Sequence, residues 1–394
     1  MRKSIQLGIC LVLAAVHCAG QTPHADHQRQ TALALEQQGK SSEAEAVWRE
    51  ILKAHPATPE PYAHLGVLEA RQEHYKQAVP LYRKALALNP STPGLRLNLG
   101  LALFKDGQWK AAVSEFAPLL KSQPPGSPEA ARLTILLGMA HYSIGEFTEA
   151  VPYLKQATAS DQQNLPLRLS LAHSCMWSKQ YQCVLDTYHE ILTLNAESAE
   201  ADMLAGEALD AKKDTPGAIQ QFRAAVKADP KASDAHFGLG YLLWMQKQYA
   251  EAASEFEAEL NNNPSHVQAM LYLGDTQMEL KHPEIALPLL ENARRIDPTQ
   301  EMAHLDLGIV YADTGRQDDA LKELKEAERM APEDVNVHWR LGRLYRSMGK
   351  KDESKAELDK ASSITRATDS ALVDKISGPS SKGEPTKQSV PPEK

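Results

Sequence analysis

Residue types that commonly carry protein chemistry are sparse in this chain of 394 residues. Its 14 histidines are scattered, and the closest set that could share a metal ion is His24 with His27. Two histidines without further ligands do not complete a metal site. The sequence also has no H-E-x-x-H, glycine-rich phosphate loop, G-x-S-x-G or C-x-x-C-H motif. We therefore expect no metal, no cofactor and no catalysis.

Two of the four cysteines could bond to each other. Cys175 and Cys183 are predicted to lie on consecutive helices, on either side of one turn, and an oxidising compartment would permit a disulfide between them. Packed helices usually hold their backbones about 8 to 10 Å apart, whereas a disulfide needs Cα atoms within about 7 Å. A disulfide and two buried thiols both stay open as alternatives, and the helix spacing favours the thiols.

Charged residues change sign along the last third of the chain. Acidic residues come first: Asp275, Glu279, Asp306 and Asp313. Arginines follow at every third residue: Arg340, Arg343 and Arg346. These arginines could bind a carboxylate or a phosphate of a partner, or form solvated pairs with the neighbouring acidic residues. The solvated pairs are the favoured interpretation, and the arginines are kept as candidate partner contacts.

A 34-residue period organises the elements that must position these side chains. Two sets of residues follow it: the prolines Pro56, Pro90, Pro124, Pro230, Pro264, Pro298 and Pro332, and the glycines Gly206, Gly240, Gly274, Gly308 and Gly342. Within each period, apolar residues recur every three to four residues in two runs, which predicts two amphipathic helices. Small residues let the two helices cross closely, and proline ends the second helix. A fixed period of this size is typical of stacked copies of one helical hairpin.

One copy shows the whole pattern in Tyr62, Leu65, Gly66, Ala78, Tyr82, Ala85 and Pro90. These residues reproduce the W-x2-L-G-x2-Y, A-x3-F, P signature of the tetratricopeptide repeat. The chain resembles that family, in its secreted or periplasmic bacterial type, over roughly residues 25–366. The resemblance implies an all-α fold, a right-handed superhelical solenoid of about ten stacked helix-turn-helix repeats.

The period slips once, by four residues. Gly100 and Gly138 are 38 residues apart, which is one period plus four. The stretch from Pro124 to Pro128 is rich in turn residues, so the extra residues are predicted to lengthen a loop rather than a helix. We assign residues 21–126 to repeats 1 to 3, residues 127–130 to a loop insertion and residues 131–366 to repeats 4 to 10.

Residues 1–20 are expected to be a secretory signal peptide. Two basic residues precede an apolar run from Ile5 to Val16, and a polar stretch follows it. The run is short for a membrane span, and no later segment approaches one. We expect export to the periplasm or the extracellular space. Cys18 raises the alternative of a lipoprotein anchor, which His17 disfavours.

The last residues, 367–394, differ from the repeats in composition. Glycine, proline and serine lie among lysines and glutamates, and few apolar residues follow Ile376. Such a segment cannot bury enough apolar surface to offset the entropy of folding. We predict a disordered tail.

The resemblance also implies which side chains face a partner. In the resembled family, the second, fifth, ninth, twelfth and thirteenth positions of the first helix line the concave face. Here these positions hold mostly apolar and aromatic side chains: Leu97, Leu101, Phe104, Ile135, Met139, Tyr142, Leu169, His173, Met176, Trp177, Met203, Phe237, Tyr241, Trp244 and Met245. An exposed apolar stripe usually marks a contact surface, although packing between hairpins could bury several of these residues. For the set as a whole, a partner-binding groove is favoured.

The sequence therefore predicts a non-catalytic protein-protein interaction scaffold. It would bind an extended or helical segment of a partner protein along the apolar concave groove. The alternative is an envelope assembly or adaptor factor of a secretion, pilus or polysaccharide machine, in which the repeats act as a spacer. A formal net charge of -8 argues against nucleic acid as the partner, because nucleic-acid binding needs clustered lysine and arginine. The oligomeric state is left open.

Overall fold

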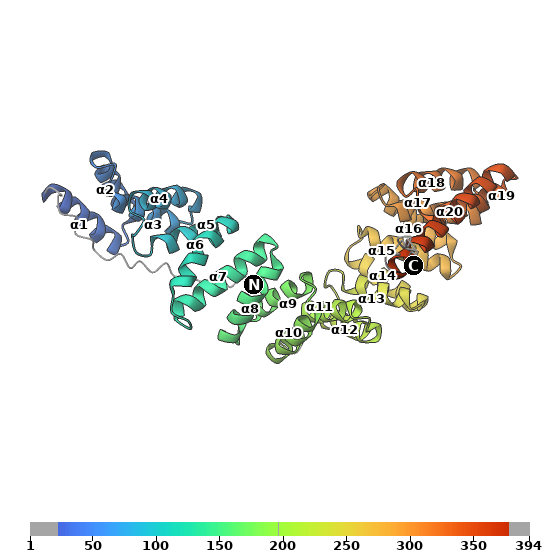
Figure 1. Cartoon of the computed structure of the whole chain (residues 1–394), viewed down its shortest axis with the longest axis horizontal. Coiled ribbons are helices and arrows are strands. Elements are labelled where there is room, and N and C mark those ends of the chain that lie inside the picture. The colour runs from blue at the N-terminus through green and yellow to red at the C-terminus, as the bar shows by residue number, and fades with distance from the viewer. Residues whose placement is uncertain (1–22, 196, 378–394) are drawn as a thin grey trace, which may run out of the picture. The chain divides into compact units, whose positions relative to one another are not determined.

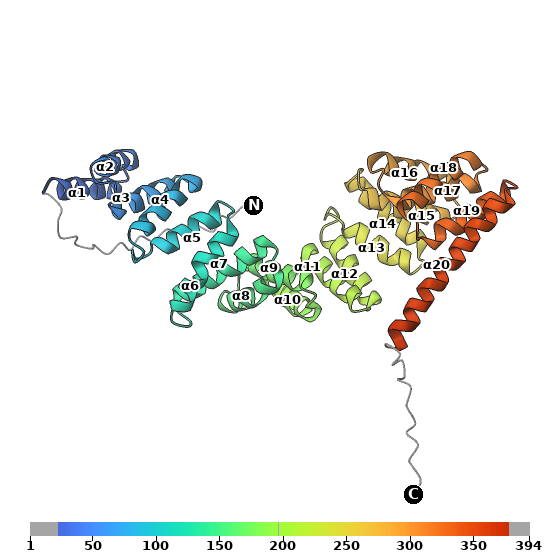
Figure 2. The ribbon, with the colours of Figure 1, turned by 45° about the horizontal axis from the view of Figure 1, so that its top comes forward.

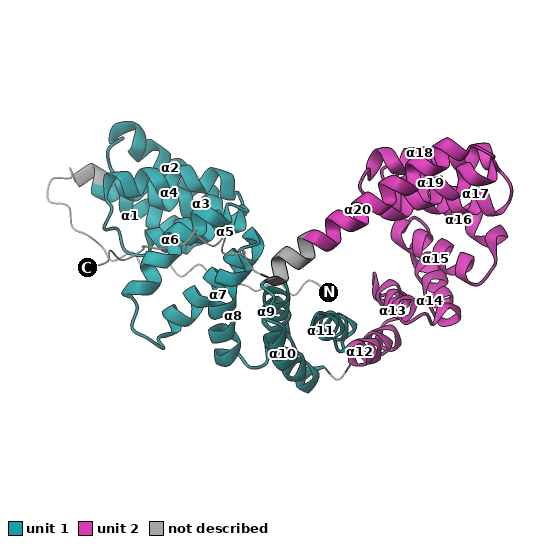
Figure 3. Cartoon of the chain, turned by 45° about the vertical axis from the view of Figure 1, so that its right-hand side comes forward, with its two compact units in different colours: residues 1–214 teal, residues 215–394 magenta. Residues whose placement is uncertain are grey.

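The computed structural model describes residues 23–195 and 197–377, and these residues form 20 α-helices and no β-strand. They divide into two compact units between Asp214 and Thr215, unit 1 (residues 1–214) and unit 2 (residues 215–394) (Figure 3). Within each unit, consecutive helices pair as hairpins that follow one another along the chain (Figure 1). The predicted all-α solenoid of helical hairpins is confirmed.

Unit 1 holds the first five hairpins and the first helix of the sixth. Its helices are α1 (Pro23–Gln37), α2 (Ser41–Ala54), α3 (Pro59–Arg71), α4 (Tyr75–Leu88), α5 (Leu95–Lys105), α6 (Trp109–Ser122), α7 (Pro128–Ile144), α8 (Phe147–Ser160), α9 (Leu165–Trp177), α10 (Tyr181–Leu194) and α11 (Ala199–Ala211). Odd-numbered helices are the first helices of their repeats, and even-numbered helices are the second.

Unit 2 begins with the second helix of the sixth repeat and holds the last four hairpins. Its helices are α12 (Thr215–Ala228), α13 (Ala235–Met245), α14 (Tyr249–Asn262), α15 (Val267–Glu279), α16 (Pro283–Ile296), α17 (Glu301–Asp313), α18 (Gln317–Met330), α19 (Val335–Ser347) and α20 (Lys351–Ser377). The division between the units therefore falls inside a repeat.

The first helices line the inner face of each unit. Neighbouring first helices contact each other, for example α7 with α9 in unit 1, and α13 with α15 and α15 with α17 in unit 2. No comparable contact joins consecutive second helices among the described residues. Because the more closely spaced helices lie on the inside of a curved stack, side chains of the first helices are available to a partner there.

A small residue in the first helix sets the crossing within a hairpin. A Cβ atom added to Gly66 would lie 2.7 Å from the ring of Tyr82, and one added to Gly240 would lie 2.8 Å from the ring of Phe256. Both rings are fully buried. The absence of a side chain at each glycine therefore leaves the space that the facing ring fills. Gly240→Leu should destabilise unit 2 by about 1 to 3 kcal/mol through overpacking.

Each hairpin within a unit reverses direction through one residue with a left-handed backbone. Five of these residues are glycines: Gly39, Gly107, Gly145, Gly315 and Gly349. The other four carry side chains: Glu73, Lys179, Lys247 and Lys281. A side chain disfavours the left-handed region by about 1 to 2 kcal/mol. The reversals without glycine are therefore strained.

The prediction of a loop insertion at residues 127–130 is wrong. The helix α7 has 17 residues, against 13 in α3 and α9, and its extra length is mostly at its N-terminal end. The Ser127 hydroxyl accepts a hydrogen bond of 3.1 Å from the backbone N–H of Ala130, and Pro128 is the first helical residue. Serine at the cap and proline at the first position favour the start of a helix. Serine and proline are also common in turns, which is why the sequence predicts a loop here.

The boundary of the tail also differs from the prediction. The helix α20 has 27 residues and continues through residues 367–377 (Figure 2), because no glycine or proline interrupts it before Gly378. Residues 378–394 and the predicted signal peptide, residues 1–20 with Cys18, lie outside the described residues and stay predictions. Among the described residues, no helix combines the length and the apolar character that crossing a membrane requires.

Candidate partner-binding surface

The predicted groove residues of α5 belong mainly to the packing of unit 1. Leu101 is 6% exposed and is part of the hydrophobic core. Leu97 and Phe104 are half-buried and pack against the same core. The alternative reading, in which adjacent hairpins bury such residues, therefore holds for repeat 3.

Four rings meet where repeats 4 and 5 adjoin, and we call them the unit 1 aromatic cluster. Tyr142 lies 5.9 Å from Phe147 and 6.5 Å from His173 between ring centroids, and Phe147 stacks on Trp177 at 6.0 Å. The Trp177 side chain is 69% exposed. Met139 and Met176 are half-buried and pack against the neighbouring core. Trp177 is therefore the exposed residue among the predicted groove residues of unit 1.

His173 in this cluster also contacts an acidic residue of the next repeat. Its Nε2 atom lies 2.8 Å from the Oε1 atom of Glu200. The hydrogen bond from His173 lowers the pKa of Glu200. Phe147 begins the second helix of its repeat, so the family positions used for the sequence prediction did not include it.

A larger ring cluster lines the inner face of unit 2, and we call it the unit 2 aromatic cluster. It consists of Phe237, Tyr241 and Trp244 on α13, Phe256 on α14 and Tyr272 on α15. The spacing of the three α13 residues, by four and then three, places them on one face of that helix. Phe256 is fully buried and anchors the cluster to the core, whereas Tyr241, Trp244 and Tyr272 are half-buried. The adjoining Met245 is 50% exposed.

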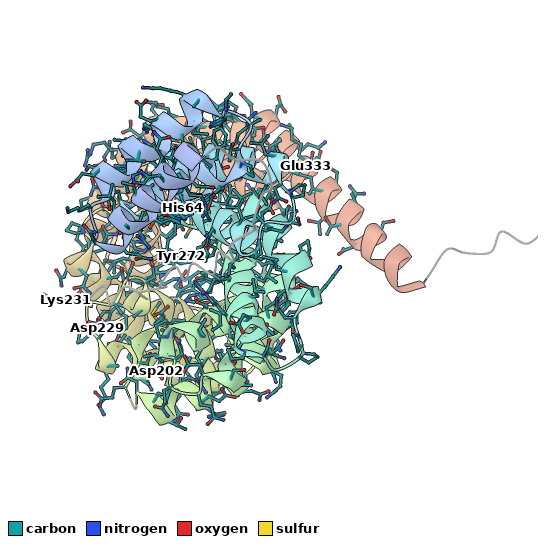
Figure 4. The ribbon with its side chains drawn as sticks, turned by 90° about the vertical axis from the view of Figure 1, so that its left-hand side faces the viewer. His64, Asp202, Asp229, Lys231, Tyr272 and Glu333 are labelled. Carbon is teal, nitrogen blue, oxygen red and sulfur yellow. A yellow bond between two sulfur atoms is a disulfide. The ribbon has the colours of Figure 1, made fainter. Side chains whose placement is uncertain are left out.

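Tyr272 links the two hairpins of this cluster (it is labelled in Figure 4). Its ring centroid lies 5.3 Å from that of Tyr241 and 5.1 Å from that of Trp244, with interplanar angles of 84° and 75°. Such edge-to-face contacts are favourable for aromatic rings. Tyr272 lies at the sixth position of its repeat, outside the family positions considered above, so the sequence reasoning missed it.

Carboxyl groups lie directly beside the unit 2 aromatic cluster. The Nε1 atom of Trp244 donates a hydrogen bond of 2.6 Å to Oδ2 of Asp275 on α15. Asp306 on α17 is only 7% exposed. Burial raises the pKa of Asp306 well above its ordinary value, and Asp275 and Glu301 add to the shift while Arg340 opposes it. Burial also raises the pKa of Tyr272, and the charges of Asp275 and Asp306 contribute.

The three predicted arginines lie on α19, and two of them lie against an exposed tryptophan. The Cζ atom of Arg340 lies 5.3 Å from the ring centroid of Trp339, and that of Arg343 lies 4.8 Å from it. Trp339 is 44% exposed, Arg343 and Arg346 are exposed and Arg340 is half-buried. Arg340 acts on Asp275 and Asp306 electrostatically, without a hydrogen bond to either. The sequence favoured solvated ion pairs between these arginines and the neighbouring acidic residues. Among the described residues, Arg340 makes no direct contact of this kind with Asp275 or Asp306.

Family comparisons agree with this architecture. A tetratricopeptide repeat model matches residues 97–164, 185–232, 203–265, 248–301, 271–335 and 305–363. A second model, described as a TPR repeat, matches residues 69–107. The matched stretches span more than half of the chain. The chain belongs to the tetratricopeptide repeat family.

Several solved structures are similar to parts of this tetratricopeptide repeat protein. YrrB, described as a TPR protein with an unusual peptide-binding site, is 23% identical, with 48% of this chain and 97% of that chain covered and a TM-score of 0.41. MamA 41-end from Desulfovibrio magneticus RS-1 is 19% identical, with 43% and 97% covered and a TM-score of 0.41. The APC/C hetero-tetramer Cut9-Hcn1 is 13% identical, with 90% and 89% covered and a TM-score of 0.42. Comparison with curated proteins gives no match.

The two cysteines form a disulfide in the fifth tetratricopeptide repeat. Cys175 on α9 and Cys183 on α10 have Cα atoms 5.8 Å apart. The bridge closes the hairpin next to its turn, where the two helices converge, so the general spacing of packed helices does not apply. The sequence prediction, which favoured two thiols, applied the spacing of packed helices to residues that lie beside a turn.

Several scattered histidines have a shared structural role in the tetratricopeptide hairpins. His236, His304 and His338 each contact, through Nδ1, a glutamate 19 residues later: Glu255 at 2.6 Å, Glu323 at 2.6 Å and Glu357 at 2.7 Å. Arg96 contacts Glu115 across the same spacing at 2.9 Å. These contacts clamp the first helix to the second. A spacing of 19 between a cationic residue and a glutamate was the sequence signal that could have revealed them.

Proposed function

We propose that the chain is a non-catalytic scaffold that binds an extended or helical segment of a partner protein along the inner face of unit 2. The tetratricopeptide repeat family typically consists of non-catalytic protein-interaction scaffolds, so family membership supports a protein-binding role. The observation that carries the finer proposal is the unit 2 aromatic cluster. All of its rings except Phe256 lie on first helices, and Tyr241, Trp244 and Tyr272 are only half-buried.

Such a surface has the composition of a binding interface. Aromatic side chains contribute a large contact area with little loss of conformational freedom, and tryptophan and tyrosine are enriched among the residues that dominate binding energy. The exposed Met245 next to the rings adds a flexible apolar contact. In unit 1, the exposed ring of Trp177 offers a second contact of the same kind.

A double substitution, Tyr241→Ala with Trp244→Ala, tests the proposed surface. We expect at least about a tenfold loss of partner capture in a crosslinking pull-down from the native extract, because two central aromatic contacts are removed. Helical circular dichroism should be preserved, since the buried ring of Phe256 stays in place. The matched control is Trp109→Ala, which removes a 37% exposed tryptophan from the second helix α6.

The outcomes separate binding from folding. Loss of capture with intact helical signal and an unaffected control supports the surface. Unchanged capture by the double variant overturns it. Loss of the helical signal assigns the two residues to the core and also overturns the proposal.

A second candidate function is an envelope assembly or adaptor factor. The observation that favours it is α20, which has 27 residues against 14 in α18 and so extends beyond its own hairpin. A helix that extends from the stack provides an attachment point. Deletion of residues 367–394 discriminates the two: partner capture persists for a groove binder, whereas localisation fails for a tethered adaptor.

Both candidates include export, which we propose from residues 1–20. The proposed cleavage follows Gly20, so the mature chain would begin at Gln21. N-terminal sequencing of protein recovered from the periplasm or the medium tests this proposal. An uncleaved N-terminus in the cytoplasm would overturn it.

A further inference from the structure

The described residues include five buried carboxylate side chains, and four of them have donors. The pairs are Asp202 with the Tyr188 hydroxyl (Asp202 is labelled in Figure 4), Glu259 with the Phe237 backbone N–H, Glu323 with His304, and Glu357 with His338. The exception is Asp306, whose Oδ2 atom is buried without a hydrogen-bond partner. A buried carboxylate without a partner is costly. Its position on a first helix, at the inner face, makes it a candidate contact for a partner.

The surroundings of Asp306 provide negative charge and aromatic rings. Asp275 and Glu301 both act electrostatically on Asp306, and both raise its pKa. Tyr272 lies close enough to be influenced by Asp275 and Asp306 together. Trp244 fixes the carboxyl of Asp275 through its indole N–H. We call Tyr241, Trp244, Tyr272, Asp275 and Asp306 the aromatic-acidic surface.

No cation of the described residues neutralises these carboxyl groups by direct contact. Arg340 acts on Asp275 and Asp306 from a distance and hydrogen-bonds to neither. Elsewhere in unit 2, two buried acids have close cationic partners: Glu323 has Arg294 and His304, and Glu357 has His338 and Lys325. The aromatic-acidic surface therefore offers carboxyl groups to a cation that the described residues do not supply.

The rings beside the carboxyl groups suit an organic cation. Tyr272 stands nearly perpendicular to Tyr241 and to Trp244, at 84° and 75°, so the rings present faces in more than one plane. A lysine ammonium or an arginine guanidinium is attracted to such faces and also to carboxylates. A metal ion fits less well, because the sets of three close metal-ligating groups among the described residues lie elsewhere, at Asp234 and at His338.

We propose that the aromatic-acidic surface binds the side chain of a lysine or arginine in the partner segment. The proposal rests on the proposed function and specifies its partner: a segment with apolar residues for the unit 2 aromatic cluster and one basic residue for Asp275 and Asp306. The basic side chain would pair with the carboxyl groups of Asp275 and Asp306, which no cation of the described residues contacts directly. Arg340, on the next first helix, would repel a second basic residue and so limit the site to one.

Peptide selection with the full chain tests this proposal. A phage-displayed library of random peptides is panned on the wild-type chain, and the selected peptides are synthesised with each basic residue in turn replaced by norleucine. Binding is measured by fluorescence anisotropy to the wild type, to Asp275→Asn with Asp306→Asn, and to the matched control Asp313→Asn, an exposed acid on the same helix as Asp306.

We expect one basic residue to dominate wild-type binding. Its replacement by norleucine should weaken binding to the wild type and to Asp313→Asn by about tenfold or more. The same replacement should change binding to the Asp275→Asn, Asp306→Asn variant by less than about twofold, because the paired carboxylates are gone. An equal effect of norleucine on all three proteins overturns the proposal.

Two further measurements keep this outcome distinct from failure of the proposed function. Selected peptides that bind Tyr241→Ala with Trp244→Ala as well as they bind the wild type overturn the groove itself. Peptides that need the rings but no basic residue overturn only the cation site.

Thermal unfolding of the Asp275→Asn, Asp306→Asn variant checks its fold, and a Tm at or above that of the wild type is expected because buried negative charge is removed. A lower Tm assigns the two acids a structural role and overturns the proposal.

Discussion

The indole N–H of Trp244 holds the carboxyl of Asp275 at 2.6 Å, across two neighbouring hairpins. Burial raises the pKa of Asp275, and this hydrogen bond is the largest of the effects that lower it. The Trp244 side chain therefore has two roles at the inner face. Its ring is part of the apolar surface, and its N–H holds the carboxyl of Asp275.

Replacing Trp244 with Phe keeps an aromatic ring and removes the donor. Since the bond to Trp244 lowers the pKa of Asp275, we expect that pKa to rise further above its ordinary value in the variant. The measurement is an NMR titration of the Asp275 side-chain carboxyl carbon. Trp109→Phe, on α6 of unit 1, is the control and should leave that titration unchanged. A Trp244→Phe variant with the wild-type titration would contradict the role assigned to the bond.

Asp306→Asn should stabilise unit 2 at neutral pH by roughly 1 to 3 kcal/mol, because it removes a buried charge without a partner. When the pKa of a carboxyl is higher in the folded than in the unfolded protein, its ionised form destabilises the fold. This destabilisation is present at pH values above the folded-state pKa and is absent below the unfolded-state pKa of about 3.9. The advantage of the variant should therefore shrink as pH falls from neutral toward about 4. Urea unfolding of both proteins across this range gives the comparison, and a gain that does not depend on pH would refute the electrostatic explanation.

The disulfide between Cys175 and Cys183 should stabilise the fifth hairpin locally. The bridge closes a short loop, with a sequence separation of 8, for which chain entropy gives about 2 to 3 kcal/mol. Cys175→Ala with Cys183→Ala should speed hydrogen exchange in α9 and α10 and leave exchange in α17 and α18 unchanged. Two free thiols in oxidised, denatured wild-type protein would show that the bridge does not form.

The reversal at Lys247 provides a test of backbone strain. Lys247 has φ of 59°, and Lys247→Gly should stabilise the hairpin of α13 and α14 by about 0.5 to 1 kcal/mol. The opposite change, Gly315→Ala, should destabilise its hairpin by about 1 to 2 kcal/mol. Because a Cβ at Gly315 meets nothing within 4 Å, the loss would come from the backbone alone. Thermal unfolding that shows the same sign for both variants would exclude this explanation.

The sequence predicted the hairpins because their determinants are local. Gly66 and Tyr82 lie within one repeat, and their contact follows from positions that the period reveals. The prediction was wrong at residues 127–130, where turn residues and helix-start residues are of the same types. Ser127 and Pro128 there begin α7. It was also wrong for residues 367–377, where the boundary was taken from composition, although the first helix breaker is Gly378.

The binding surface was predicted only in part because it joins different repeats. Tyr241 and Trp244 were identified from positions in one helix. Their contacts with Tyr272 and Asp275 cross to the next repeat and depend on how hairpins stack. The burial of Asp306 Oδ2 without a hydrogen-bond partner likewise depends on tertiary packing. Neither the contacts between repeats nor the burial of Asp306 can be predicted from the sequence of a single repeat.

The left-handed reversals also imply a difference in local opening within unit 2. Lys247 and Lys281 occupy the reversals of two consecutive repeats, whereas the last two repeats have Gly315 and Gly349. Native-state exchange should therefore show lower local protection at the hairpins of Lys247 and Lys281 than at those of Gly315 and Gly349. An exchange between lysine and glycine at one site per repeat would change this local stability without changing any residue of the inner face.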